Sequence, residues 1–327
     1  MSAGAQTDTL FPTFERIGSR PDKYKTGFIN RTGLRVVDPR FDYGLPFRCG
    51  LSPVKRGKVW GAIDGSGKLV IEPISHSPLV INEDRIVYSS ANGKLGVMNL
   101  DGQIVIKPSY RILVGFQEGV SWMSVDRLYG FVTTNGQQLA APMYEDARSF
   151  SDGVAPVKLG GKWGYIDKFL EFRIPPQFDF ALPFSEGLAR VENAGLWGYI
   201  NQNGKYVISP QYVAARDFHQ GMAEVEVGNL WGYIDHNGEI VVKLAFRRTS
   251  EFVEGVAAVA PHDHPNGHYG FINREGIYVI PPLYEMVGTF RHGLCFVELA
   301  DEVAYVDHDG DVIWRGPYVD VGRISEL

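Results

Sequence analysis

Apolar and polar residues alternate in short stretches along most of the chain, and these stretches recur in a fixed order. A stretch of the form F-x-x-G-x-A-x-V is followed by W-G-Y-I-D-x-x-G and then by x-x-V-I-x-P-x-Y. The outer pieces alternate apolar with other residues and the middle piece is β-branched and aromatic, so each predicts a short β-strand. The Asp-x-x-Gly or Asn-x-x-Gly element predicts a hairpin turn. One repeat is therefore expected to be a three-stranded antiparallel unit.

A glycine marks the same place in each repeat. It stands at Gly27, Gly61, Gly96, Gly130, Gly164, Gly198, Gly232 and Gly270, and a ninth position holds Ala304. A proline follows twelve residues later in most repeats. Because proline cannot donate to a β-ladder, we expect it to close the third strand. The spacing predicts nine tandem units of about 34 residues, stacked because such a unit cannot close a core alone.

Tryptophan precedes the glycine in four repeats, which predicts a structural core position. The four pairs are Trp60-Gly61, Trp163-Gly164, Trp197-Gly198 and Trp231-Gly232. Glycine inside a strand indicates that something approaches the backbone closely, and we expect an aromatic ring of the same or the next repeat. The core position predicts that Trp197→Ala costs about 3–5 kcal/mol of stability.

The segment KWGYIDKFLEFRIPPQFDFALPFSEG, residues 162–187, and the two repeats that follow it resemble the bacterial WG-repeat family, also called KWG repeats. The resemblance runs from about Phe11 to Leu327. It implies an interaction role rather than one shared chemistry. The first, third and ninth repeats depart most from the pattern, and divergence at the two ends is typical of capping units.

The repeats predict an all-β fold with one domain. Residues 1–10 are expected to be a disordered N-terminal tail, and residues 11–327 a single WG-repeat array of nine units. Propeller blades usually have four strands and about 40–45 residues, so we favour an open superhelical β-solenoid of three-stranded units. A β-propeller is the alternative.

Composition and charge narrow the classes of partner. The chain has 327 residues and a net charge of −6, which argues against a dedicated nucleic-acid binder. Residues 1–60 carry 11 Lys and Arg against 5 Asp and Glu, so a basic end precedes an acidic body. The cysteines Cys49 and Cys295 form no CxxC pair. Neither a signal peptide nor a long apolar run is visible, so we expect a cytoplasmic protein without membrane contact.

Sequence motifs of catalysis and cofactor binding are missing. The chain contains no GxGxxG, Walker, GxSxG or HExxH motif, so we expect no enzyme activity and no cofactor. One loop, residues 260–270, holds His262, Asp263, His264 and His268. Three imidazoles at this spacing could bind Zn²⁺ or Ni²⁺, but proline, asparagine and glycine around them favour a solvated hairpin tip. We therefore predict no metal site.

Variable positions in the first strand are the candidate partner-binding residues. Their neighbours one position earlier are uniformly small, and adjacent strand residues face opposite ways. We therefore expect the small row to pack inward and the variable row to face out, although the variable side chains could also be half-buried at the edge of the stack. The candidates on this row, called here the first-strand row, are Tyr88, Trp122, Arg190, Glu224 and Phe296.

These patterns favour a non-enzymatic protein-binding scaffold. Regular core positions with variable surface positions allow new partners without refolding. Neutralisation of a cognate bacterial toxin or effector, as an immunity protein performs it, is one form of this role. The alternative is a carbohydrate or small-ligand binding module that uses surface aromatics. The partner is expected to be another protein, and the sequence leaves the oligomeric state open.

Overall fold

The computed structural model describes residues 9–16 and 24–317, and within those ranges the chain forms strands and turns without a helix. A helix able to span a membrane is accordingly not found there. Residues 1–8 of the predicted tail lie outside the described residues. Leu10 is 1% exposed and packs with Phe28 and Val37. The predicted array divides into two compact units, residues 1–115 with 286–327 (unit 1) and residues 116–285 (unit 2).

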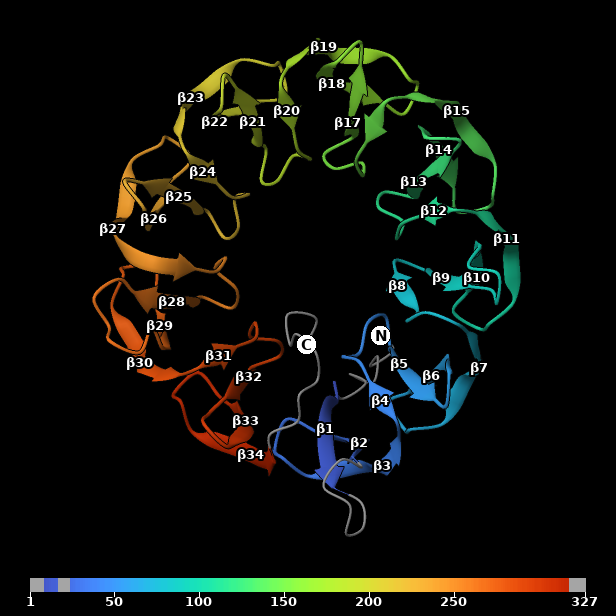
Figure 1. Ribbon diagram of the computed structural model, residues 1–327, viewed down its shortest axis with the longest axis vertical. Helices are drawn as coiled ribbons and strands as arrows, with labels where there is room; N and C mark the ends of the chain where they lie inside the picture. The colour runs from blue at the N-terminus through green and yellow to red at the C-terminus, as the bar shows by residue number, and fades with distance from the viewer. Residues whose placement is uncertain (1–8, 17–23, 318–327) are drawn as a thin grey trace, which may run out of the picture. The chain divides into compact units, whose positions relative to one another are not determined.

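Unit 1 contains sheets β1-β2-β3, β4-β5-β6-β7, β11-β10-β9-β8 and β31-β32-β33-β34 (Figure 1). The strands of its first segment are β1 (Phe11–Arg16), β2 (Tyr24–Ile29), β3 (Arg35–Phe41), β4 (Tyr43–Gly44), β5 (Leu51–Arg56), β6 (Val59–Asp64), β7 (Leu69–Ser75), β8 (Val80–Asn82), β9 (Arg85–Ser89), β10 (Leu95–Asn99), β11 (Ile104–Tyr110) and β12 (Ile112–Leu113). The strands of its second segment are β31 (Met286–Val287), β32 (Cys295–Glu298), β33 (Glu302–Val306) and β34 (Val312–Pro317).

Unit 2 repeats the same order of strands, and its last two repeats merge into one seven-stranded sheet, β24 to β30. Its strands are β13 (Val120–Val125), β14 (Leu128–Thr133), β15 (Gln138–Tyr144), β16 (Asp146–Ala147), β17 (Val154–Leu159), β18 (Lys162–Asp167), β19 (Phe172–Phe178), β20 (Phe180–Ala181), β21 (Ala189–Asn193), β22 (Leu196–Ile200), β23 (Tyr206–Tyr212), β24 (Ala214–Ala215), β25 (Ala223–Val227), β26 (Leu230–Ile234), β27 (Ile240–Thr249), β28 (Ala257–Pro261), β29 (Tyr269–Ile272) and β30 (Tyr278–Tyr284).

Most sheets have a fourth strand that the sequence did not predict. It is usually two residues long and pairs antiparallel with the first predicted strand, as where Ala181 lies opposite Val191. The prediction of three strands fits the sheet β1-β2-β3, while six other sheets have four strands. A strand of two residues is too short to show an alternating pattern, so no sequence pattern predicts it.

The predicted hairpin turn between the second and third strands is present. In the turn after β22, the side-chain oxygen of Asn201 accepts hydrogen bonds from the backbone N–H groups of Asn203, at 3.0 Å, and Lys205, at 3.1 Å. Gly204 has a φ of 74°, which a residue with a Cβ rarely adopts. The repeated Asp or Asn and Gly therefore fix the turn as the sequence indicated.

The glycine of each Trp-Gly pair lies against backbone rather than against an aromatic ring. A Cβ on Gly164 would lie 2.6 Å from the carbonyl oxygen of Ile174 and 2.6 Å from the backbone nitrogen of Pro176. The pairing of β18 with β19 changes register there, since Trp163 lies opposite Phe178 and Tyr165 opposite Ile174. At the Trp-Gly pairs the predicted aromatic neighbour is therefore wrong: a β-bulge in the third strand brings the backbone close.

The same bulge corrects the predicted role of proline. Pro176 lies within β19, which continues to Phe178, so proline does not close the third strand. Proline has no N–H to donate, and a bulge leaves a residue outside the ladder, so the two features suit one another. The eight repeat glycines all meet the third strand in this way: Gly27, Gly61, Gly96, Gly130, Gly164, Gly198, Gly232 and Gly270. At Gly96 an aromatic ring approaches as well, since a Cβ there would lie 3.0 Å from Cε1 of Tyr88.

The four tryptophans differ in burial. Trp163 is 1% exposed and Trp60 is 7% exposed, whereas Trp197 and Trp231 are half-buried. A guanidinium group covers the ring of Trp197, since the Cζ atom of Arg190 lies 5.3 Å from the ring centroid. This geometry is that of a cation–π contact.

We expect Trp197→Ala to destabilise the protein by about 2 kcal/mol, less than a fully buried tryptophan would, because part of the ring already faces solvent. The free energy of unfolding, from urea denaturation, measures this. Loss of 4 kcal/mol or more would contradict the half-buried position, on the scale of about 3–5 kcal/mol for a buried tryptophan.

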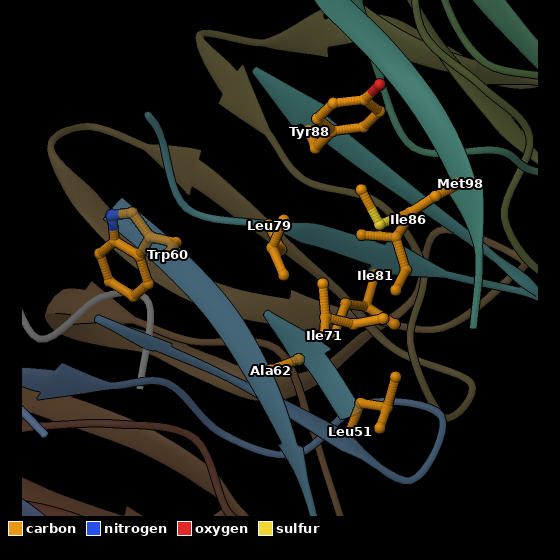
Figure 2. Close-up of a cluster of buried hydrophobic side chains, with 9 residues drawn as sticks. All are labelled: Leu51, Trp60, Ala62, Ile71, Leu79, Ile81, Ile86, Tyr88 and Met98. Carbon is orange, nitrogen blue, oxygen red and sulfur yellow. The ribbon is translucent and has the colours of Figure 1, made fainter. Parts of the chain in front are cut away.

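Figure 2 shows one of the cores of unit 1, which is built from adjacent sheets. Its members come from β5, β6 and β7 on one side and from β9 and β10 on the other, with Leu79 before β8 and Ile81 within it. The cluster consists of Leu51, Trp60, Ala62, Ile71, Leu79, Ile81, Ile86, Tyr88 and Met98. Apolar side chains thus join one repeat to the next, as expected for units that cannot fold alone.

The first and last repeats pack against each other within unit 1, where β1 lies beside β34 (Figure 1). The hydroxyl of Tyr305 donates to the carbonyl of Pro12 at 3.0 Å, and the Tyr305 ring lies 5.4 Å from that of Phe11. In unit 2 the equivalent hydroxyls each donate to a carbonyl 17 residues later, in the next repeat; they are those of Tyr165, Tyr199 and Tyr233. The two terminal repeats therefore bury apolar surface in each other rather than ending as polar caps.

Candidate functional site

The first-strand row faces the next repeat and does not form an exposed stripe. Glu224 is 1% exposed and Phe296 is 2% exposed, while Trp122 and Arg190 are half-buried. The neighbouring small row is buried too, with Ala189 and Ala223 both at 0%. The prediction that the row faces outward is therefore wrong for Glu224 and Phe296. Neighbouring repeats cover both faces of a sheet, so alternation along a strand does not separate core from surface here.

Tyr88 does not belong to the row. It lies opposite Gly96, whereas Arg190 lies opposite Tyr199, the residue after the repeat glycine. A shift of one residue moves a side chain to the other face of its sheet. The third repeat has a hairpin one residue longer, and this extra residue made Tyr88 look equivalent. Tyr88 is 5% exposed and belongs to the core in Figure 2.

The two remaining aromatic candidates contact other rings. Trp122 lies 5.6 Å from Tyr129, centroid to centroid, and packs against a core whose residues come from β13 to β18. Phe296 makes an edge contact with Tyr305 at 5.3 Å, in the cluster that joins the last repeat to the first. Both rings are thus part of the packing between repeats.

Arg190 makes a polar link from its own repeat to the next. From β21, its Nε donates to Asp217 Oδ1 at 2.6 Å, and its Nη1 donates to the carbonyl of Ala215 at the end of β24. Ala215 ends β24 of the sheet that follows (Figure 1), and Asp217 lies in the loop between β24 and β25. One guanidinium group therefore pairs with a carboxylate and a carbonyl across the interface between two repeats.

Glu224 occupies the place of Arg190 in the following repeat. It lies opposite Tyr233 just as Arg190 lies opposite Tyr199. Moving the Arg190 contacts forward by 34 residues places Glu251 where Asp217 stands and Thr249 where Ala215 stands. Glu251 pairs with His219, whose Nε2 lies 3.0 Å from Glu251 Oε2. The interface that Arg190 bridges in one repeat holds two glutamates in the next.

Burial changes the charge state of Glu224 in the interface that it forms with Glu251. It raises the pKa of Glu224 to about 7 from an ordinary 4.5; nearby Glu251 adds to the rise, and the Glu224 backbone, Arg216 and His219 oppose it. Neither carboxylate oxygen of Glu224 makes a side-chain hydrogen bond of normal geometry. The hydrogen bond to Glu251 raises the pKa of His219. A buried carboxylate of this kind, next to other titratable groups, is a candidate functional group.

An exposed apolar row that the sequence reasoning missed lies on the third strands of unit 2. The first two residues of consecutive third strands are apolar and open to solvent, between 38% and 57% exposed. They are Tyr206 and Val207 of β23, Ile240 and Val241 of β27, and Tyr278 and Val279 of β30. We call this set the exposed row. These pairs are the second and third positions of the x-x-V-I-x-P stretch, and alternation along the strand does not single them out as exposed.

The sequence matches the family model described as WG containing repeat. The matched segments are residues 27–60, 60–75, 96–128, 129–163, 163–197, 197–231, 231–260 and 269–301. They cover most of the chain. The chain belongs to the WG-repeat family. No curated protein matches it.

Solved structures are similar to this WG-repeat chain at low sequence identity. The crystal structure of the eukaryotic initiation factor has a TM-score of 0.65 and 11% identity, covering 95% of this chain and 96% of that one. The computationally designed Ika8 protein has a TM-score of 0.48 and 12% identity, covering 84% and 95%. BamB from Moraxella catarrhalis has a TM-score of 0.44 and 10% identity, covering 76% and 91%. The first of these likenesses concerns the fold alone.

The histidine loop of this WG-repeat chain falls between two matched segments, residues 231–260 and 269–301. The His264 and His268 rings lie 5.6 Å apart, centroid to centroid. Across residues 9–16 and 24–317, no three His, Cys, Asp or Glu side chains converge in a group that could hold a metal ion. The loop therefore adds no candidate site.

Proposed function

We propose that this WG-repeat chain is a non-enzymatic protein-binding scaffold, and that unit 2 binds its partner through the exposed row. The observation that carries this proposal is the recurrence of exposed apolar pairs at the same two positions of three successive third strands. Natural proteins usually protect strand edges with charges or proline, because an exposed apolar edge invites association. Here the pairs remain apolar, as at a protein-binding surface.

Charge and burial favour a protein partner over a sugar. The acidic excess of the chain beyond residue 60 suits a partner with basic groups around its contact surface. Of the aromatics that would serve as stacking platforms, Tyr88 and Phe296 are buried. The carbohydrate-binding alternative is therefore weaker, and neutralisation of a toxin remains one form of the scaffold role.

We expect the triple variant Val207→Lys, Val241→Lys and Val279→Lys to lose the partner, because three buried ammonium groups cannot be accommodated in an apolar contact. Tagged wild-type and variant proteins would be incubated with cell lysate, and bound proteins quantified by mass spectrometry. We expect a near-stoichiometric partner on the wild type and at least a tenfold loss on the variant.

A matched control separates the exposed row from exposed apolar residues in general. Leu196, Val213 and Val227 are 37%, 66% and 44% exposed in the same unit but lie off the third-strand pairs. Their triple replacement by lysine should leave capture unchanged. Equal loss in both variants, or a partner retained by the exposed-row variant, would place the contact elsewhere.

We also infer that the array follows the propeller alternative rather than the open solenoid. The support lies within unit 1. Tyr305 of the last repeat donates to Pro12 of the first, as its equivalents in unit 2 donate to the repeat that follows them. The ends of an open array have no such neighbour. Four-stranded sheets also suit propeller blades.

A further inference from the structure

The two polar interfaces described above differ in one group. In one, the Arg190 guanidinium joins Asp217 and the Ala215 carbonyl. In the next, the equivalent acceptors are Glu251 and Thr249, and the residue that would supply the cation is Glu224. The acceptors of a guanidinium are kept, while Glu224 holds the strand position of Arg190. The guanidinium of Arg216 lies over the ring of Trp231, with its Cζ atom 5.4 Å from the ring centroid.

Glu224 gives a second and independent indication of a ligand. Its side chain is almost completely buried, at 1% exposure, and neither oxygen has a hydrogen-bond partner of normal geometry among the described residues. Buried carboxylates are normally paired or hydrogen-bonded, because an unpaired one costs several kcal/mol. The buried Glu224 carboxylate, without a hydrogen-bond partner and next to the Glu251 carboxylate, indicates that its positively charged partner comes from outside the chain.

We propose that the interface of Glu224 and Glu251 is a binding site for a guanidinium cation, either free or on the arginine side chain of another molecule. The cation would sit between the two carboxylates and bond the Thr249 carbonyl, as the Arg190 guanidinium does with Asp217 and Ala215. This inference is independent of the exposed row.

The chemistry of the site favours guanidinium over a metal ion. Guanidinium is planar, offers several N–H donors and is weakly hydrated, so it suits carboxylates that are partly buried. Metal ligands must converge on one point, and no such group of three is found in the part of the chain that the structure describes. The side chains of His219 and Glu251 are 43% and 44% exposed, so this part of the interface is open to solvent.

Every charged group around Glu224 bears on how binding responds to pH. Glu251, in the loop between β27 and β28, favours a cation, and Arg216 and His219, which also face Glu224, oppose one. Asp217 accepts a hydrogen bond from Arg190, so its charge is already paired. As pH rises, Glu224 loses its proton and His219 loses its charge, so both changes favour the cation. Binding should therefore be weak in acid and strong in mild alkali.

Calorimetric titration of the full chain with guanidinium chloride, at millimolar concentrations that do not unfold it, tests the proposal. Since the pKa of Glu224 is about 7, about one molecule in ten is ionised at pH 6 and about nine in ten at pH 8. We expect binding about tenfold tighter at pH 8 than at pH 6. N-acetylarginine amide separates the two sources: binding of both ligands indicates a side chain, and binding of guanidinium alone indicates a small cation.

Variants identify the site. Glu224→Arg places a guanidinium in the interface and should abolish binding. Glu224→Gln should weaken binding at least tenfold at pH 8 and remove the part of the pH dependence that comes from Glu224. Glu251→Gln changes a half-exposed residue and should weaken binding severalfold even if Glu224→Arg does not fold. The proposal is overturned by absence of binding at pH 8, by equal binding of tetramethylammonium, which has no N–H donor, or by wild-type affinity in these variants.

Discussion

We expect Gly198→Ala to lower the free energy of unfolding by about 3 kcal/mol, although it adds only one methyl group. The new Cβ would lie 2.6 Å from the carbonyl oxygen of Ile208 and 2.7 Å from the backbone nitrogen of Pro210. Both atoms belong to the backbone of β23 at its bulge, so no side chain can rotate away. The sheet must separate β22 from β23 locally, and urea denaturation would measure the loss.

The control is Gly195→Ala, the same substitution three residues earlier. Gly195 has a φ of 80°, but nothing lies within 4 Å of an added Cβ. Only the backbone strain remains, about 1–2 kcal/mol for a residue with a Cβ in the left-handed region. If the two variants lose equal stability, close approach of the backbone is not the reason for the repeated glycine.

The repeats, the strands and the turns could be predicted from the sequence, because each depends on short-range signals. Asn201 and Gly204 fix a turn within five residues, and the alternation in β21 and β23 marks two strands. The existence of a close approach at Gly198 was also visible, since glycine is unfavourable in a strand. The group that approaches Gly198, the backbone of β23, could not be predicted. The bulge depends on the pairing of two strands rather than on the sequence of one.

The candidate site was harder to predict, because its burial depends on neighbouring repeats. Alternation along one strand assumes that one face of the sheet meets solvent, whereas Ala223 and Glu224 are buried on opposite faces. The link from Arg190 to Asp217 spans 27 residues and appears only when the two sheets are stacked. The register of Tyr88 depended on one extra hairpin residue, which spacing alone cannot locate.

The second large effect is expected at Glu224, and it depends on pH. The folded chain holds the pKa of Glu224 at about 7, above the ordinary 4.5 of the unfolded chain. Below pH 4.5 the carboxyl is protonated in both states and costs nothing. Between pH 4.5 and pH 7 the unfolded chain releases its proton and the folded chain keeps it, so stability falls. Above pH 7 both are ionised and the loss stays constant, at about 3 kcal/mol for a shift of this size.

Glu224→Gln should remove this loss, since an amide has a similar shape and no charge. We expect the variant to be more stable than the wild type by about 3 kcal/mol at pH 8 and to match it near pH 4. Urea denaturation across this pH range would show the two curves separating as pH rises. Glu239→Gln, at an exposed position of the same unit, serves as the control and should follow the wild type at every pH.

Ionised Glu224 lowers the stability of the folded chain at neutral pH, and this loss links the pH dependence of stability to the binding of guanidinium. Replacing Glu224 by a neutral residue would strengthen the fold, so packing alone does not account for a carboxylate at this position. A cation bound between Glu224 and Glu251 would offset the cost, because it favours the ionised form that burial disfavours. Guanidinium at millimolar concentration should therefore raise the stability of the wild type at pH 8 and leave Glu224→Gln unchanged. If both respond equally, the cost at Glu224 has no connection with a ligand.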